Sequence, residues 1–257
     1  MKRVLSIWLP QLPLDLRVRR GDPRVTQAFA IISEIKNAWR LTHLSEAAHA
    51  AGLSPELSLP DARAICPQLL TEPCDPVREA ALLRALWRWA DSLSPWVALD
   101  PPDGLFLDIT GCAHLFGGER AMAVHTRERL SDMNVISRIG VADTKGAAWA
   151  LARFKGRTIE IAAEGKTGAA LAALPLEGLR VPPKIATDLR RTGLKTIGQL
   201  SEVKPAELAR RFGLDLTKAL SATLGHAPDP VSSKAADPIY AARMTLPDPI
   251  GLRDDLL

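Results

Sequence analysis

The sequence predicts an α+β protein that combines a mixed sheet with helices on one face, a small second unit and an all-helical region. Short apolar runs with strand character occur at both ends of the first 163 residues. Amphipathic helical patterns lie between them, and after residue 163 the composition shifts to Ala, Leu, Arg and Lys at helical spacing. A chain of 257 residues, 47% of them hydrophobic, is long enough to bury such cores.

The first 76 residues predict one strand of the main sheet and then the small unit. The run "VLSIWL" (Val4–Leu9) has the continuous apolar character of a strand covered on both faces, and a helix follows it within residues 1–19. Residues 20–76 form the small unit, with a strand in "AFAIISEI" and helices in "LSEAAHAAG" and "LPDARAICPQL". We interpret the stretch "TEPCDP" as the linker that ends this unit.

Residues 77–163 predict the rest of the main sheet. The helix expected over 77–92 carries five apolar residues on one face, and "DGLFLDITG" alternates like a half-buried strand. A helix over 119–133, a strand over 135–141 and a helix over 145–154 complete the alternation.

Residues 164–227 repeat a pattern of helix, Gly-centred turn and helix, which predicts a compact all-helical region. From about Gly225 the sequence is rich in Pro and Asp, the composition of an exposed linker. We expect residues 228–257 to contain this linker and the start of a further region that the chain does not complete.

Composition excludes several classes of protein. A formal charge of +4 permits a nucleic-acid partner without requiring one. Three cysteines without a CxxC pair argue against a disulfide framework and a structural zinc site, and they fit a reducing cytoplasm. Pro10 and Pro13 interrupt the N-terminal apolar run, which therefore suits neither a signal peptide nor a membrane span.

The acidic residues Asp100, Asp103 and Asp108 surround the strand in "SPWVALDPPDGLFLDITG". Metal-dependent chemistry needs acids that converge on an ion, so these carboxylates are catalytic candidates. The Pro-Pro-Asp-Gly context favours a turn-forming role for Asp103, and Asp108 fits a strand-end or capping acid. The five histidines show no helical metal-ligand spacing, and we expect neither a metal nor a cofactor.

Two further features are candidates for nucleic-acid contacts. Six tryptophans could stack on bases, although most lie in segments expected to be packed, which favours a core role. The stretch "LRRTGLKTIGQL" fits a helical hairpin whose turn binds DNA phosphates, and it fits a solvated basic face equally well. Its candidate DNA-binding residues are Arg190, Arg191, Gly193, Lys195, Thr196 and Gly198.

The stretch "QLPLDL" (Gln11–Leu16) has a Gln-Leu-x-Leu core similar to bacterial sliding-clamp ligands. It directly follows the first strand, so we expect Leu12, Leu14 and Leu16 to serve folding.

Taken in order, four motifs resemble the Y-family translesion DNA polymerases across nearly the whole chain. "GLSPELSLPDARAICPQL" resembles the fingers segment of that family, and "SPWVALDPPDGLFLDITG" resembles its central palm motif. "ISRIGVADTKGAAWALARF" resembles the palm strand and helix that carry a family lysine, and the segment Leu174–Gly213 resembles the helix-hairpin-helix thumb. The resemblance implies palm over 1–19 and 77–163, fingers over 20–76, thumb over 164–227 and an incomplete little-finger region after it.

The chain departs from the family pattern at its catalytic positions. The family presents an aspartate where this chain has Trp8, and an Asp-Glu pair where it has Asp103 and Gly104. The fingers tyrosine and arginine that hold the incoming triphosphate align with Glu46 and His49. Lys145 is the remaining nucleotide contact that the resemblance implies.

This pattern of loss resembles the Y-family-like proteins of bacterial mutagenesis cassettes, and the "WLPQLP" and "LRVPPK" stretches support it. The resemblance implies a non-catalytic, cytoplasmic and nucleoid-associated scaffold in SOS-induced translesion synthesis. Its implied partners are primer-template DNA, an error-prone C-family polymerase, a recombinase-like protein of the ImuA type and a sliding clamp, the last through a region beyond this chain.

Two alternatives stay open. A weak polymerase could use Asp103, Asp108 or Glu46 in a rearranged metal site. A protein-interaction module without a DNA role is favoured by the first thumb hairpin, where Arg180 and Pro182 replace a Gly-x-Gly turn and where Pro182 and Pro183 have no N–H to donate.

Overall fold

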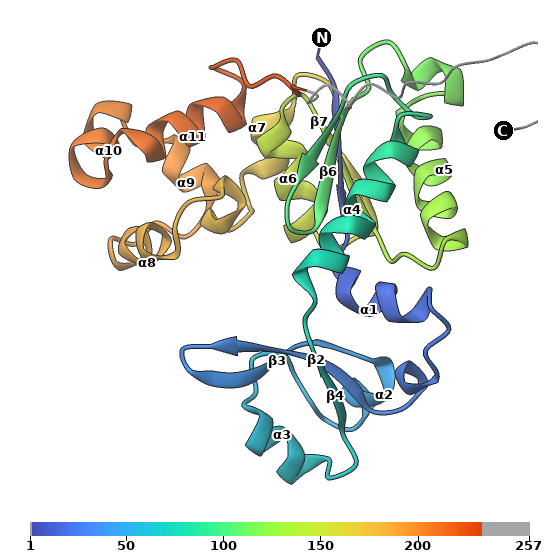
Figure 1. Cartoon of the computed structure of the whole chain (residues 1–257). Helices are drawn as coiled ribbons and strands as arrows, with labels where there is room; N and C mark the ends of the chain where they lie inside the picture. Colours follow the sequence, from blue (N-terminus) through green and yellow to red (C-terminus); the bar gives the residue numbers. More distant parts are fainter. Residues whose placement is uncertain (1, 233–257) are drawn as a thin grey trace, which may run out of the picture.

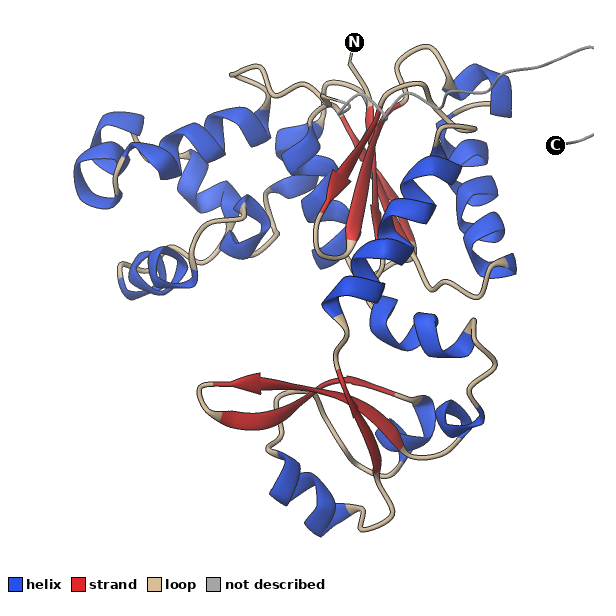
Figure 2. Ribbon diagram, viewed as in Figure 1, coloured by secondary structure: helices blue, strands red, loops and turns tan. Residues whose placement is uncertain are grey.

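A computed structural model describes residues 2–232 and contains two separate sheets (Figures 1 and 2). The larger sheet has five strands, and its central strand β1 pairs antiparallel with both neighbours. One edge pair, β7 with β8, is parallel, so the sheet is mixed as predicted. The strand order is β5 (Val97–Asp100), β6 (Gly104–Asp108), β1 (Val4–Trp8), β7 (Arg138–Ala142) and β8 (Ile159–Ile161).

One face of this sheet is covered by three helices. Leu5 and Ile7 of β1 point to this face together with the alternating apolar residues of β6 and β7. They pack against α4 (Pro76–Ala90), α5 (Glu119–Asp132) and α1 (Leu12–Val18). Leu12, Leu14 and Leu16 are all at most 8% exposed, which confirms that the "QLPLDL" leucines serve folding.

The opposite face carries α6 (Lys145–Phe154), so helices lie on both faces of the sheet, where we expected them on one. The helix crosses β7 at Gly140, where a Cβ would lie 2.1 Å from the carbonyl oxygen of Ala148. The missing side chain therefore permits this close approach. Periodicity alone could not predict it, because an apolar helix fits either face equally well.

The smaller sheet has the order β3 (Ala38–Leu44), β2 (Phe29–Ile35) and β4 (Leu70–Pro73). The helices α2 (Glu46–Ala50) and α3 (Leu59–Ile65) and the 3₁₀ turn η1 (Pro23–Thr26) belong to the same unit. The interpretation of "TEPCDP" as a linker was wrong in its first half, because β4 pairs in parallel with β2. A strand of four residues containing Pro73 carries too little alternation to be recognised.

The predicted all-helical region is confirmed, and we call residues Thr167–Leu224 the helical unit. It contains α7 (Thr167–Leu171), a 3₁₀ turn η3 (Leu176–Leu179), α8 (Pro183–Arg191), α9 (Ile197–Ser201), α10 (Pro205–Phe212) and α11 (Leu214–Leu224). Its buried leucines form one core with α6 of the main sheet. The helical unit is therefore anchored on the face that carries α6.

The chain continues to contact the main sheet region after α11. Asp229 forms an ion pair with Lys145 at 2.6 Å, and Val231 is only 6% exposed. These residues lie in the segment expected to be an exposed linker, whereas the expected little-finger region lies outside the described residues. The three cysteines are free thiols. Among residues 2–232, no helix is long and apolar enough to cross a bilayer.

Candidate functional site

Trp8 and Asp103 meet at one corner of the main sheet. Trp8 ends β1 opposite Gly104, the first residue of β6, and the turn between β5 and β6 brings Asp103 beside it. The Trp8 indole Nε1 donates a hydrogen bond of 2.8 Å to Asp103 Oδ2, and the Leu9 amide donates to the Asp103 carbonyl oxygen at 2.9 Å. Trp8 and Asp103, two residues at which the sequence departs from the family pattern or retains it, are therefore in direct contact.

Arg153 of α6 occupies the other oxygen of Asp103. Its Nη2 donates to Asp103 Oδ1 at 2.8 Å and lies 3.6 Å from Asp100 Oδ2. The side chain is 9% exposed, and burial lowers the pKa of the guanidinium although the two carboxylates oppose this shift. Two carboxylates thus surround one buried arginine, whose Nη1 has no partner among the described residues.

Arg180 extends this network to the helical unit. Its Nη2 donates to Asp100 Oδ1 at 2.7 Å, and the Asp100 side chain is 6% exposed. Arg180 follows η3 and has a left-handed backbone, with φ of 58°. We call Asp100, Asp103, Arg153 and Arg180 the arginine clasp.

Aromatic rings lie beside the cations of the clasp. The Arg153 guanidinium carbon lies 5.3 Å from the Trp8 ring centroid and 4.3 Å from that of Trp149, and Arg180 lies 5.0 Å from Trp149. Arg138 of β7 approaches Trp8 at 5.5 Å. Each contact lies within the range of cation–π attraction, which stabilises these positive charges.

Gly104 lies directly beneath the clasp. A Cβ built there would lie 3.1 Å from Asp100 Oδ2, 3.1 Å from the Ile7 carbonyl oxygen and 3.3 Å from Arg153 Nη2. A side chain at this position would therefore be in tight contact with the atoms of the clasp.

The geometry does not fit a divalent cation at this corner. Both oxygens of Asp103 accept hydrogen bonds, and Arg153 and Arg180 neutralise Asp100. Magnesium needs several oxygen ligands, with two or more carboxylates for a two-metal site. No group of three or more potential ligands among His, Cys, Asp and Glu occurs within residues 2–232.

The other sequence-predicted residues lie elsewhere. Lys145 follows β7 at the end of the sheet where Ala142 pairs with Val4, opposite the end where Arg138 pairs with Trp8. Asp108 lies at that same distant end, where it accepts from the Thr110 amide at 3.0 Å and pairs with Lys2 at 3.8 Å. The structure therefore does not bring Lys145 or Asp108 to the corner.

Glu46 and His49 line a separate cavity of about 380 Å³ between α1 and α2. Another residue of the small unit, His43, lies close enough to the corner that the charge of Asp103 affects the pKa of its imidazole. Burial lowers the pKa of the His43 imidazole, and the negative charge of Asp103 acts against this shift. His43 on β3 therefore marks where the small unit approaches the corner.

Trp149, Arg153 and Arg180 are the corner residues that sequence reasoning missed. A signal was present, because Trp149 and Arg153 are spaced four residues apart in an Ala-rich helix and must share one face. Arg180 was noted for its turn, and its ion pair with Asp100 spans 80 residues of sequence.

The turn from Gly193 to Gly198 is the candidate DNA contact of the helical unit. Its backbone amides are already engaged: Lys195 and Thr196 donate to Gln199 Oε1, and Gly198 donates to the Ala172 carbonyl oxygen at 2.9 Å. A Cβ at position 198 would lie 2.8 Å from that same oxygen, so this glycine permits packing against α7. The turn thus has no free amide that could bind a phosphate as it stands.

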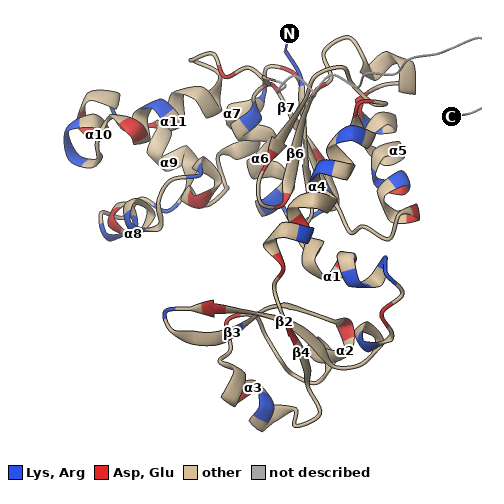
Figure 3. Ribbon diagram, in the orientation of Figure 1, with Lys and Arg blue, Asp and Glu red and all other residues tan. Residues whose placement is uncertain are grey.

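The basic side chains around this turn are more available for a ligand than its backbone amides. Lys195 is exposed. Within the described part of the chain, Arg191 forms only an exposed ion pair with Asp188 at 3.3 Å, and Arg190 pairs with Glu177. Figure 3 shows further basic residues at the end of α10, where Arg210 and Arg211 lie.

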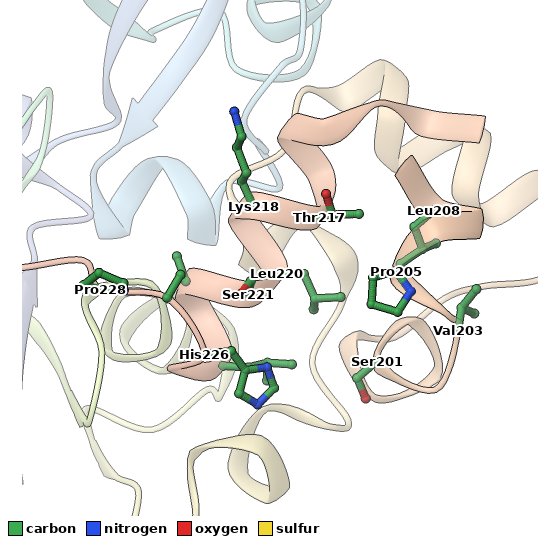
Figure 4. Close-up of a pocket in the computed structure, with 13 residues that line it drawn as sticks. Ser201, Val203, Pro205, Leu208, Thr217, Lys218, Leu220, Ser221, His226 and Pro228 are labelled. Carbon is green, nitrogen blue, oxygen red and sulfur yellow. The ribbon is translucent and has the colours of Figure 1, made fainter. Parts of the chain in front are cut away.

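A cavity of about 570 Å³ in the helical unit lies between α9, α10 and α11. Leu208 and Leu220 contribute to its apolar lining, and His226 and Pro228 border it (Figure 4). It is separate from the clasp.

The larger part of the chain superimposes on Y-family DNA polymerases. The insertion ternary complex of Dbh DNA polymerase matches with a TM-score of 0.74 over 89% of this chain and 69% of that one, at 14% identity. The crystal structure of DinB from Sulfolobus solfataricus matches with a TM-score of 0.69, the same coverage and 15% identity. Residues 17–153 match the impB/mucB/samB family, and the chain belongs to this family.

Among curated proteins, the chain is similar to Protein ImuB of Caulobacter vibrioides. The two are 42% identical over 205 residues, which cover 80% of this chain and 44% of that protein. DNA polymerase IV 2 of Mesorhizobium japonicum is 30% identical over 155 residues, 59% of this chain and 37% of that one. The match therefore spans less than half the length of these relatives.

Proposed function

We propose that this chain is a catalytically silent, Y-family polymerase-like scaffold that binds DNA in damage tolerance and SOS-induced translesion synthesis. The observation that carries the proposal is the arginine clasp. Where the family resemblance expects carboxylates to hold metal ions, Trp8 and Arg153 occupy both oxygens of Asp103.

The physical argument concerns the activation of the primer 3′-hydroxyl. In two-metal phosphoryl transfer, one ion activates the attacking oxygen and both ions stabilise the charge that develops. The indole of Trp8 cannot coordinate a metal ion, and the guanidinium of Arg153 occupies an oxygen of Asp103 that a metal ion would need. Each 1.36 kcal/mol of lost transition-state stabilisation slows transfer about tenfold, so we expect a loss of many orders of magnitude.

DNA binding is proposed for the side chains of the helical unit. Arg190, Arg191 and Lys195 lie together near one turn, and the chain resembles structures of Dbh solved as insertion and post-insertion complexes. Contacts to phosphates are independent of sequence and weaken with salt. Gly193, Thr196 and Gly198 shape the turn in this proposal.

The partners are proposed from the family resemblance. They are an error-prone C-family polymerase, a recombinase-like protein of the ImuA type and a sliding clamp. A cytoplasmic, nucleoid-associated location accompanies this role. Lys145 is the proposed remnant of the nucleotide site, and Glu46 and His49 stand in place of the triphosphate contacts of the family.

A second candidate is a protein-interaction module without DNA binding. The observation that favours it is the internal engagement of the amides in the Gly193–Gly198 turn.

Primer extension tests the proposal directly. We would compare the wild type with Asp103→Ala and with Trp8→Asp on a primed template, first with magnesium and then with manganese, beside an active Y-family polymerase. We expect no extension by the wild type or by Asp103→Ala. Extension by the wild type that disappears in Asp103→Ala would overturn the silent-scaffold proposal and identify a weak polymerase. A separate binding measurement distinguishes the second candidate. If the protein is not retained on DNA at physiological salt, the interaction module without DNA binding is favoured instead.

A further inference from the structure

Trp39 is an exposed tryptophan that the arginine clasp does not explain. It is 44% exposed and lies in β3, two residues after the turn that joins β2 to β3. Trp8, Trp87 and Trp149, by contrast, are fixed by hydrogen bonds or stacked cations. The core role favoured for the tryptophans therefore does not hold for Trp39, whose indole has no hydrogen bond within the described part of the chain.

The hairpin that carries this ring has a defined turn and a side-chain hydrogen bond next to the ring. Lys36 and Asn37 form its two-residue turn, and both have a positive φ, 53° and 59°, as a type I′ turn requires. The neighbouring Arg40 is tied down, because its Nη1 donates to the Glu56 carbonyl oxygen at 2.8 Å. A rigid strand that holds an exposed ring loses little conformational entropy when a ligand stacks on it.

The surroundings of the ring combine apolar surface with charge. Ile35, beside the turn, is 39% exposed, and Lys36 is exposed at its tip. Glu34 lies directly opposite Trp39 in the strand pairing and adds one negative charge. Lys36 supplies a cation for a backbone phosphate, and the indole supplies a face for a base.

The hairpin lies on the same side of the molecule as part of the helical unit (Figure 1). In Figure 1 the β2–β3 turn and α8 of the helical unit extend to the same side of the molecule. Along β3, Trp39 lies four residues from His43, which is about 13 Å of extended chain. The charge of Asp103 acts on the His43 imidazole, so β3 runs from the neighbourhood of the corner to Trp39.

We propose that Trp39 is a stacking platform for an unpaired base of single-stranded DNA that extends beyond a duplex held by the helical unit. This inference rests on the proposed DNA-binding function and names a contact outside the clasp and the helical unit.

The test compares the affinities of Trp39→Ala, Trp39→Phe and Trp96→Ala for two DNA molecules. Fluorescence anisotropy would measure binding of a blunt duplex and of the same duplex with a 5′ single-stranded overhang. Trp96 is the matched control, because it is 57% exposed and its carbonyl oxygen accepts from Asp108, at the opposite end of the main sheet from Trp8. Circular dichroism would verify that each variant is folded.

We expect Trp39→Ala to weaken binding of the overhang DNA about tenfold, because base–aromatic stacking contributes roughly 1–3 kcal/mol. Trp39→Phe should keep most of this affinity, Trp96→Ala should keep all of it, and blunt duplex binding should not change. Equal losses on both DNA molecules, or an overhang that adds no affinity, would overturn the stacking role alone. A wild type that binds neither DNA would overturn the proposed function as well.

Discussion

Arg180 of the helical unit donates a hydrogen bond of 2.7 Å to Asp100 of β5 in the main sheet. The pair closes the arginine clasp from the outside, because Asp100 also faces Arg153 at 3.6 Å. Arg180 holds this position with a left-handed backbone that costs a residue with a side chain on the order of 1 kcal/mol. The contact thus links the helical unit directly to the corner of the main sheet where the family resemblance places the catalytic residues.

Replacement of Arg180 by Gly tests the contribution of the contact between Arg180 and Asp100. Glycine relieves the backbone strain, yet the change leaves the buried Asp100 carboxylate with Arg153 alone. We expect a net loss of about 1–2 kcal/mol in the free energy of unfolding, measured by urea denaturation, because the pair is partly exposed. The double variant with Asp100→Asn should lose less than the sum of the single variants. Strict additivity would show that the contact contributes nothing.

Gly104 should not tolerate a side chain without rearrangement. A Cβ there meets the Ile7 backbone oxygen and Asp100 Oδ2, both at 3.1 Å, and the backbone atom cannot move freely. We expect Gly104→Ala to lower the free energy of unfolding by about 1–3 kcal/mol, measured by thermal and urea denaturation. Gly168→Ala in α7 is the control, because nothing lies within 4 Å of its Cβ position. A neutral Gly104→Ala variant would contradict the close packing of the clasp.

Asp15 should make stability depend on pH. Burial raises the pKa of this carboxyl group to about 7, although the Ile136 amide donates to it at 3.0 Å. The folded chain therefore binds a proton that the unfolded chain releases near pH 4, so the stability present at low pH is lost as the pH rises toward 7. The slope should approach about 1.4 kcal/mol per pH unit at most, measured by urea denaturation from acid to neutral pH.

Asp15→Asn is the matched control for this slope. The amide oxygen can still accept from Ile136, and the residue no longer titrates. We expect a flatter profile between about pH 4 and 7. An unchanged profile would assign the pH dependence to other groups.

The basic residues of the helical unit should determine how DNA affinity responds to salt. Each phosphate contact contributes about 0.9 to the slope of log affinity against log salt concentration. The triple variant of Arg190, Arg191 and Lys195 to Ala should therefore flatten this slope by up to about 3. The control replaces Arg120 and Arg127, exposed residues of α5 on the main sheet, and should leave the slope unchanged. Equal slopes for all variants would remove these residues from the interface.

Much of the fold follows from local pattern. The helix over 145–154 was predicted with the bounds of α6, because Thr144 caps it through the Ala147 amide and the helix is rich in Ala and Leu. The four-residue strands β4 and β5 escaped prediction, because a strand that short is defined by its partners. The placement of α6 on the second face depended on Gly140, whose role becomes visible only when the helix is packed on it.

The sequence by itself determined the α+β class, the order of the units and the identity of the unusual residues Trp8, Asp103 and Gly104. Their chemistry was decided by tertiary structure alone. Arg153 and Arg180 lie far from Asp100 in sequence, and only the packing of α6 and the helical unit brings both guanidinium groups to the carboxylates. A charge is neutralised by what lies beside it in space, and sequence distance carries no information about that.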